Sequence, residues 1–152
     1  MADALPSSGE DDVVVPPPRL LEPLSGQGRV FAVIAAGGAI GALARYGVGL
    51  ALPHGTGAFP LGTFLINVVG CLLIGALIVV ITEWRQAHPL VRPFVVTGFL
   101  GGFTTFSTYA VDSEQLLATG RVGTAAAYIA GTLAAAVLAT WAGIRLARAV
   151  HR

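Results

Sequence analysis

The stretch Gly98–Tyr109, GFLGGFTTFSTY, places three glycines and four serine or threonine residues inside an otherwise apolar run. Glycine weakens a helix by about 1 kcal/mol and a β-branched residue by a few tenths of a kcal/mol. In lipid, an interrupted backbone is tolerated only where protein, a cavity or an ion satisfies the freed groups. The stretch therefore predicts one of two structures. It is either a broken helix with its break at the membrane midplane, near Phe103 and Thr104, or a close helix crossing through Gly98 and Gly102.

The composition around this stretch is that of an all-α membrane protein. Of the 152 residues, 55% are hydrophobic and only 11% are charged. A membrane helix needs about 20 mostly apolar residues. Four segments satisfy this requirement, which predicts a four-helix transmembrane domain over residues 30–152 with spans at about 30–52, 60–81, 91–117 and 122–144.

The residues before the first span have a different composition. Residues 1–29 contain Pro16-Pro17-Pro18 and most of the acidic side chains, with little apolar periodicity. Such a segment cannot bury enough apolar surface to fold alone, so we expect a disordered N-terminal tail. It also lacks the basic start and apolar core of a secretory signal.

The basic residues are distributed unequally between the two sides of the predicted domain. All nine are arginine, and only Arg121 lies in a loop on the side opposite the termini. Seven lie on the side of the termini and of the loop between spans two and three: Arg19, Arg29, Arg85, Arg92, Arg145, Arg148 and Arg152. The positive-inside rule then predicts that both termini are cytoplasmic.

Few polar side chains fall within the spans, and these are the candidate site residues. Asn67 lies about 10 Å inside the second span at 1.5 Å per residue, and its amide could serve an anion or simply bond to a neighbouring helix. Arg45 could attract anions, or its charge could reach the nearer membrane surface. Span four carries a hydroxyl row that includes Tyr128 and Thr132, which either bonds to backbone and neighbouring helices or lines a polar path. Beside it runs a stripe of small residues suited to helix packing: Gly123, Ala127, Gly131, Ala135, Ala139 and Gly143.

The sequence gives little support for a catalytic site or for proton-coupled transport. No carboxylate occurs in residues 30–81, 91–111 or 122–144, whereas proton-coupled carriers generally use one at membrane depth. The three histidines, His54, His88 and His151, lie in predicted loops or the tail without metal-ligand spacing, so we expect them to be solvated. We therefore expect a protein that is not an enzyme.

Three segments resemble the signatures of the CrcB/Fluc family of fluoride channels. They are GGAIGALARY at 37–46, GTFLIN at 62–67 and GFLGGFTTFSTY at 98–109, and the resemblance extends over about residues 30–150. It implies a passive, fluoride-selective channel that exports fluoride across a bacterial cell membrane. It also implies an antiparallel dimer of four-helix subunits with a structural sodium ion at the dimer interface.

The resemblance also assigns roles to residues of this chain. The sodium would be held by the backbone carbonyls of Gly101 and Thr104 at the break. The fluoride pathway would include Arg45, Asn67, Phe106, Ser107, Thr108, Tyr109, Tyr128 and Thr132. Tyr109 departs from the pattern, because the family has a phenylalanine at this position.

The arginine asymmetry leads to a second hypothesis. A subunit that inserts in both orientations should have balanced basic loops, whereas this chain is committed to one. An antiparallel assembly would then need an oppositely biased homologue, which makes a heterodimer the favoured arrangement over a homodimer. The alternatives are that this chain is a non-conducting partner subunit or, less in keeping with the absent carboxylate, a small multidrug-type exporter. The expected partners are fluoride, the lipid bilayer and a second subunit, with no nucleic acid.

Overall fold

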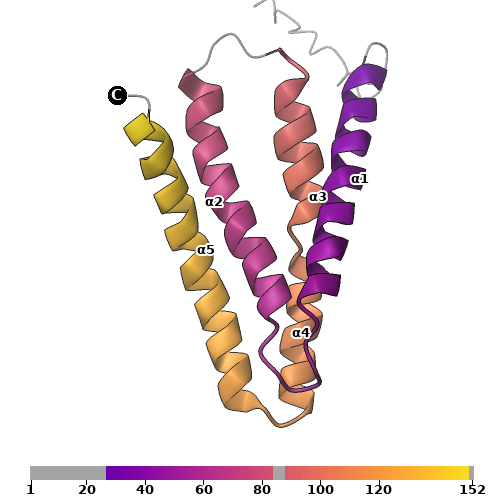
Figure 1. The fold of residues 1–152 in the computed structure, drawn as a ribbon, viewed down its shortest axis with the longest axis vertical. Helices are drawn as coiled ribbons and strands as arrows, with labels where there is room; N and C mark the ends of the chain where they lie inside the picture. Colours follow the sequence, from indigo (N-terminus) through magenta and orange to yellow (C-terminus); the bar gives the residue numbers. More distant parts are fainter. Residues whose placement is uncertain (1–26, 84–87, 151–152) are drawn as a thin grey trace, which may run out of the picture.

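The computed structural model describes residues 27–83 and 88–150, and their elements are all helical (Figure 1). In chain order they are α1 (Gly28–Ala51), α2 (Leu61–Glu83), η1 (Pro93–Leu100), α3 (Gly101–Phe103), α4 (Phe106–Ala118) and α5 (Val122–Val150). Helices η1, α3 and α4 together make the third span, and η1 has wider, π-helical turns. Four helical segments are thus long and apolar enough to cross a membrane, which confirms the predicted all-helical, four-span architecture for this part of the chain.

Two predicted boundaries differ from the structure. Helix α1 begins at Gly28, so the end of the predicted N-terminal tail is helical, while residues 1–26 of that tail lie outside the described residues. Helix α5 continues six residues past Ile144 to Val150. Arginine forms helices well and can extend its charged end away from lipid. Arg145 and Arg148 therefore end the apolar run without ending the helix.

The connections divide between the two ends of the molecule. The start of α1, the ends of α2 and α5 and the start of η1 lie at one end in Figure 1. The loops after α1 and after α4 lie at the other end. Among the described residues, Arg29, Arg92, Arg145 and Arg148 therefore lie toward one end and Arg121 lies at the other. The other arginines of the predicted asymmetry, Arg19, Arg85 and Arg152, lie outside the described residues.

The third span crosses α1 through glycine contacts. A Cβ atom added to Gly98 would lie 2.7 Å from the Ile34 carbonyl oxygen, and one added to Gly102 would collide with the Gly38 carbonyl. Gly37 and Gly41 on α1 are equally close to the backbone of the third span. The close crossing and the interrupted helix, which the sequence presented as alternatives, therefore occur together.

The second contact joins α2 to α5, again through small residues. Gly75 faces the backbone of Thr140, and Gly143 faces the backbone of Leu72. The small-residue stripe expected along span four packs only in its later half, because Cβ atoms added to Gly123 and Gly131 would meet open space. Only 11% to 22% of each span's most apolar window is buried, so most side chains of each helix are half-buried or exposed in the single subunit.

Candidate functional site

The third span is interrupted at Thr104 and Thr105, between α3 and α4. Thr104 has φ −76° and ψ 159°, and Thr105 has φ −149° and ψ 123°, both extended conformations. The Thr104 N–H and hydroxyl donate to the Leu100 carbonyl at 3.0 and 2.8 Å. The Thr105 hydroxyl oxygen accepts from the Thr108 N–H at 3.1 Å, which caps the start of α4. The side chains of the interruption thus cap both helix ends.

Two side chains from other helices support this interruption. The Asn67 amide oxygen accepts from the Thr105 N–H at 2.9 Å, and the Asn67 amide nitrogen donates to the Thr105 carbonyl at 2.9 Å. The Arg45 Nε donates to the Gly102 carbonyl at 3.1 Å. Asn67 and Arg45, which the sequence places in the fluoride pathway, therefore also satisfy backbone groups that the interruption frees. A primary amide has two N–H donors, so Asn67 retains one for another acceptor.

The carbonyls predicted to hold sodium have lost their helical donors. In a continuous α-helix, the Gly101 carbonyl accepts from the Thr105 N–H and the Thr104 carbonyl from the Thr108 N–H. Here the Thr105 N–H donates to Asn67 and the Thr108 N–H to the Thr105 side chain. Broken transmembrane helices use such freed carbonyls to coordinate sodium. Gly101 and Thr104 therefore fit the donor chemistry of a sodium site.

A groove of about 380 Å³ runs beside the interruption and gathers most of the predicted site residues. Six of them line it: Asn67, Gly101, Thr104, Phe106, Tyr109 and Thr132. The Phe106 side chain is 79% exposed there. Residues from α2, the third span and α5 thus share one surface, although they are far apart in the sequence.

The remaining predicted residues lie elsewhere. Arg45 and Thr108 line a second cavity of about 370 Å³, which also contacts Thr63 and His54. Ser107 is exposed in the first turn of α4, with its hydroxyl 3.3 Å from that of Thr105. Tyr128 is fully buried. The structure therefore brings the predicted pathway residues together in part, and divides the rest between the second cavity, the surface and the core.

The groove wall contains an unusual hydroxyl. Thr132 is only 5% exposed, and its Oγ1 has no hydrogen-bond partner among the described residues. A helical threonine can bond to the carbonyl four residues earlier, as Thr140 does with Ala136 at 2.9 Å. A buried hydroxyl without a partner costs about 1–3 kcal/mol. Thr132 therefore has the unused donor that a bound anion would need.

Aromatic rings continue from the groove into the core. The Phe106 and Tyr109 ring centres are 5.8 Å apart, and those of Tyr109 and Tyr128 are 5.3 Å apart. The Tyr109 hydroxyl donates to the Ile129 carbonyl of α5 at 3.3 Å. The hydroxyl that departs from the family pattern is therefore engaged with α5, while the ring itself lines the groove.

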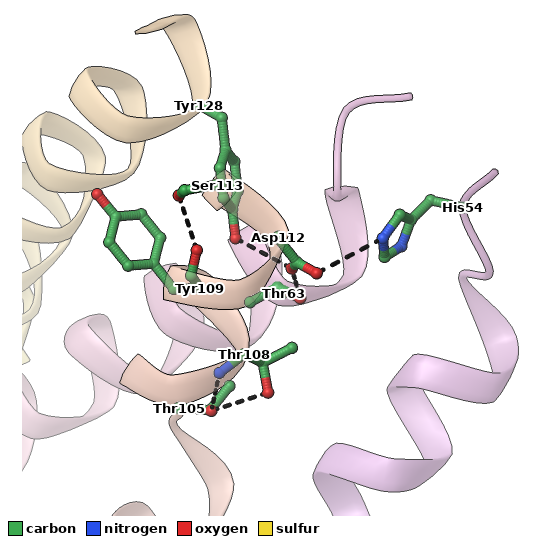
Figure 2. A network of polar contacts seen from close by, with 8 residues as sticks. All are labelled: His54, Thr63, Thr105, Thr108, Tyr109, Asp112, Ser113 and Tyr128. Atoms are coloured by element: carbon green, nitrogen blue, oxygen red, sulfur yellow. Dashed lines mark hydrogen bonds and ion pairs between the residues drawn. The ribbon is translucent and has the colours of Figure 1, made fainter. Parts of the chain in front are cut away.

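A cluster around Asp112 was not expected from the sequence (Figure 2). Asp112 is 6% exposed, and its Oδ2 accepts from the hydroxyls of Thr63 at 2.7 Å and Tyr128 at 3.3 Å. The His54 Nε2 lies 3.7 Å from Asp112 Oδ1. His54 does lie in a loop, as predicted, but it is not simply solvated. One signal was available, since Asp112 follows Tyr109 by one helical turn and so continues its face.

The fold defines a multi-pass membrane protein, and a mostly apolar groove with a few polar side chains lies between its helices. The family model described as CrcB-like protein, Camphor Resistance (CrcB), matches residues 32–144. The chain belongs to this CrcB family, as its resemblance predicted.

Individual relatives agree with the family match. The chain is 56% identical over 124 residues to "Fluoride-specific ion channel FluC 1" of Streptomyces coelicolor, covering 82% of this chain and 80% of that protein. It is 53% identical over 128 residues to "Fluoride-specific ion channel FluC 2" of Streptomyces avermitilis, covering 84% and 81%. It is 47% identical over 110 residues to "Fluoride-specific ion channel FluC 2" of Thermobifida fusca, covering 72% and 82%. These relatives are named as ion channels, so the family is not one of enzymes.

Proposed function

We propose that this chain forms a passive, fluoride-selective channel. The observation that carries the proposal is the unpartnered Thr132 hydroxyl, buried in the wall of the groove that Phe106 and Asn67 also line. The names of the relatives identify fluoride as the ion that such a channel conducts.

The groove offers fluoride three kinds of contact. The Thr132 hydroxyl and the remaining Asn67 N–H can each donate a hydrogen bond to it. The electropositive edge of the Phe106 ring can face it without carrying a full charge. None of these groups is a full cation, so each holds fluoride weakly enough to release it to the next, as conduction requires. Movement down the concentration gradient would then export fluoride from the cytoplasm of a bacterial cell.

A structural sodium ion at the interruption forms part of the same proposal. The Gly101 and Thr104 carbonyls would hold it, because neither accepts its helical N–H. When bound, sodium supplies a positive charge that satisfies these carbonyls, and it is not transported. One chain offers two such carbonyls, so a second chain would complete the coordination.

The second subunit would be antiparallel and would cover the groove. Phe106 is 79% exposed and Gly101 is open on this face, so a single chain leaves the site uncovered. The arginine-rich end, with both termini, would face the cytoplasm. An oppositely biased homologue would supply the inverted orientation, which makes this chain one half of a heterodimer.

The second candidate function follows from the same asymmetry. If the partner carries the conducting pathway, this chain is a non-conducting subunit that stabilises it. The Asn67, Phe106 and Thr132 side chains would then be dispensable for fluoride flux through the two-chain complex.

Fluoride efflux from liposomes that contain the purified chain tests the channel directly, with chloride efflux as the control. Rapid loss of fluoride alone establishes the channel and overturns the requirement for a partner. If no efflux occurs, reconstitution with an oppositely biased homologue decides between half a channel and no channel. Groove variants of this chain then distinguish a conducting subunit from a non-conducting one.

A further inference from the structure

The Asp112 cluster lies outside the groove, because His54, Thr63, Asp112 and Tyr128 are not among the residues that line it. Its carboxylate holds two hydroxyl groups that come from α2 and α5, those of Thr63 and Tyr128. Each hydroxyl has a single proton to donate. While both protons are directed at Asp112, neither hydroxyl can donate to an anion, and the carboxylate itself repels one.

His54 connects this carboxylate to solvent. Its side chain is 32% exposed, and its Nε2 is 3.7 Å from Asp112 Oδ1, within the range of an ion pair but too long for a hydrogen bond. With Asp112 it lines a small cavity of about 90 Å³. With Arg45 and Thr63 it lines the larger second cavity. The ring is thus accessible to protons and adjacent to a place where an anion could approach.

We propose that His54 and Asp112 form a proton-operated charge gate at this end of the fluoride pathway, an inference that rests on the proposed channel function. When His54 takes a proton from solvent, its positive charge neutralises Asp112 and draws the carboxylate toward the ring. The Thr63 and Tyr128 hydroxyls are then released to donate to fluoride. When His54 is neutral, Asp112 retains both hydroxyls and keeps anions away.

The other groups around the pair do not reproduce this response. Arg45 from α1 shares the second cavity with His54, and Arg121 lies against Gly57 of the same loop. Arginine stays protonated throughout the working range. Glu114 on α4 is exposed, and phenols ordinarily lose their proton only near about pH 10. Histidine is the side chain that ordinarily changes charge between about pH 5 and 8.

The test is fluoride efflux at about pH 8 and about pH 6, where histidine changes charge. The liposomes contain the full chain, reconstituted with an oppositely biased homologue if the chain alone gives no flux. Efflux from protein-free liposomes at each pH is subtracted, because protonated fluoride crosses lipid unaided. The wild-type flux should rise severalfold at the lower pH. His54→Gln should remain at the low flux at both pH values, and Asp112→Asn should remain at the high flux at both. His88→Gln, at the opposite end of the molecule, should respond as the wild type does.

The outcomes separate the gate from the channel. Equal wild-type flux at both pH values, or a retained pH response in His54→Gln, overturns the gate and leaves the channel standing. Low flux in an assembled Asp112→Asn variant also overturns the gate. Should Asp112→Asn fail to assemble, the comparison of His54→Gln with His88→Gln still decides. Absence of fluoride flux from the wild type, both alone and with the oppositely biased homologue, contradicts the proposed channel function, whereas flux without a pH response contradicts the gate alone.

Discussion

At the interruption of the third span, polar side chains are hydrogen-bonded to the backbone, whereas in the groove wall the hydroxyl of Thr132 is without a partner among the described residues. The two regions border the same groove and use similar residue types. Asn67 and Arg45 replace helical bonds that the chain has lost, so removing them should damage the structure first. The Thr132 hydroxyl makes no hydrogen bond within the described residues, so removing it should weaken only the binding of an ion in the groove. Whether a polar side chain already hydrogen-bonds to the backbone, rather than its polarity alone, therefore indicates whether it supports the interruption or is free to bind an ion.

The largest effect is expected for Asn67→Ala. This change leaves the N–H and carbonyl of Thr105 without partners, at about 1–3 kcal/mol for each unsatisfied buried group. It also removes the second amide N–H from the groove. We expect fluoride flux to be abolished and the thermal unfolding temperature in detergent to fall. Asn67→Asp keeps an acceptor for the Thr105 N–H but loses the donor to the Thr105 carbonyl and adds a carboxyl group at membrane depth, so it should also lose stability. Unchanged flux and stability in Asn67→Ala would show that the interruption does not depend on this amide.

Phe106→Ile should abolish or strongly slow fluoride flux with little loss of stability. The ring is 79% exposed in the groove, so little packing within the chain is lost, but the aromatic edge is removed. Efflux and size-exclusion chromatography would be measured on the same preparation, to show that the oligomeric state is the same as that of the wild type. Wild-type flux in this variant would remove Phe106 from the pathway.

Thr132→Val should reduce fluoride flux by about tenfold to a hundredfold, because a hydrogen bond to an anion contributes about 1.5–3 kcal/mol. The unfolding temperature should stay the same or rise slightly, because no bond within the chain is lost. Thr140→Val is the matched control, since the Thr140 hydroxyl bonds only to its own helix. Equal flux in the two variants would contradict a ligand role for Thr132.

Arg45→Lys separates attraction of anions from support of the interruption. Lysine keeps the positive charge but cannot reproduce the Nε bond to the Gly102 carbonyl with the same geometry. If support is the main role, stability should fall by about 1–2 kcal/mol and flux should fall with it. Arg45→Gln should then be no worse than Arg45→Lys. Wild-type flux in Arg45→Lys, with strong loss in Arg45→Gln, would instead favour anion attraction.

The smallest effect is expected for Tyr109→Phe. The change removes one hydrogen bond of 3.3 Å to Ile129 and keeps the ring in the groove. Fluoride flux should be nearly unchanged, and stability should fall by at most about 1 kcal/mol. A large change in flux in either direction would show that the hydroxyl itself enters the pathway.

The stretch Gly98–Tyr109 is one part of the structure that the sequence predicted only incompletely. Its composition indicated both a close helix crossing and an interruption, and helix propensity could not choose between them. The structure contains both, because Gly98 and Gly102 admit α1 while Thr104 and Thr105 change direction. The partners that make this possible, Asn67 and Arg45, lie on two other helices. The composition of one stretch cannot predict which side chains of other helices will contact it.

The Asp112 cluster and the groove illustrate the same limit for the candidate site. The sequence located Asn67, Phe106, Tyr109 and Thr132 by a family resemblance, and they do line one groove. It did not predict that Asp112 would be buried beside His54. Burial of a carboxylate depends on hydroxyls from α2 and α5, which only the packed structure brings to it.

The sequence by itself determined the class of protein, the number of spans and the arginine asymmetry between the two ends. These follow from composition, because lipid requires long apolar segments and arginines collect outside them. The tertiary structure decided which polar groups are satisfied and which are free. It directed Asn67 to Thr105, Tyr109 to Ile129 and Tyr128 to Asp112, and it left the Thr132 hydroxyl without a partner among the residues described. The reason is geometric: a hydrogen bond requires two groups within about 3 Å, and only helix packing determines that distance.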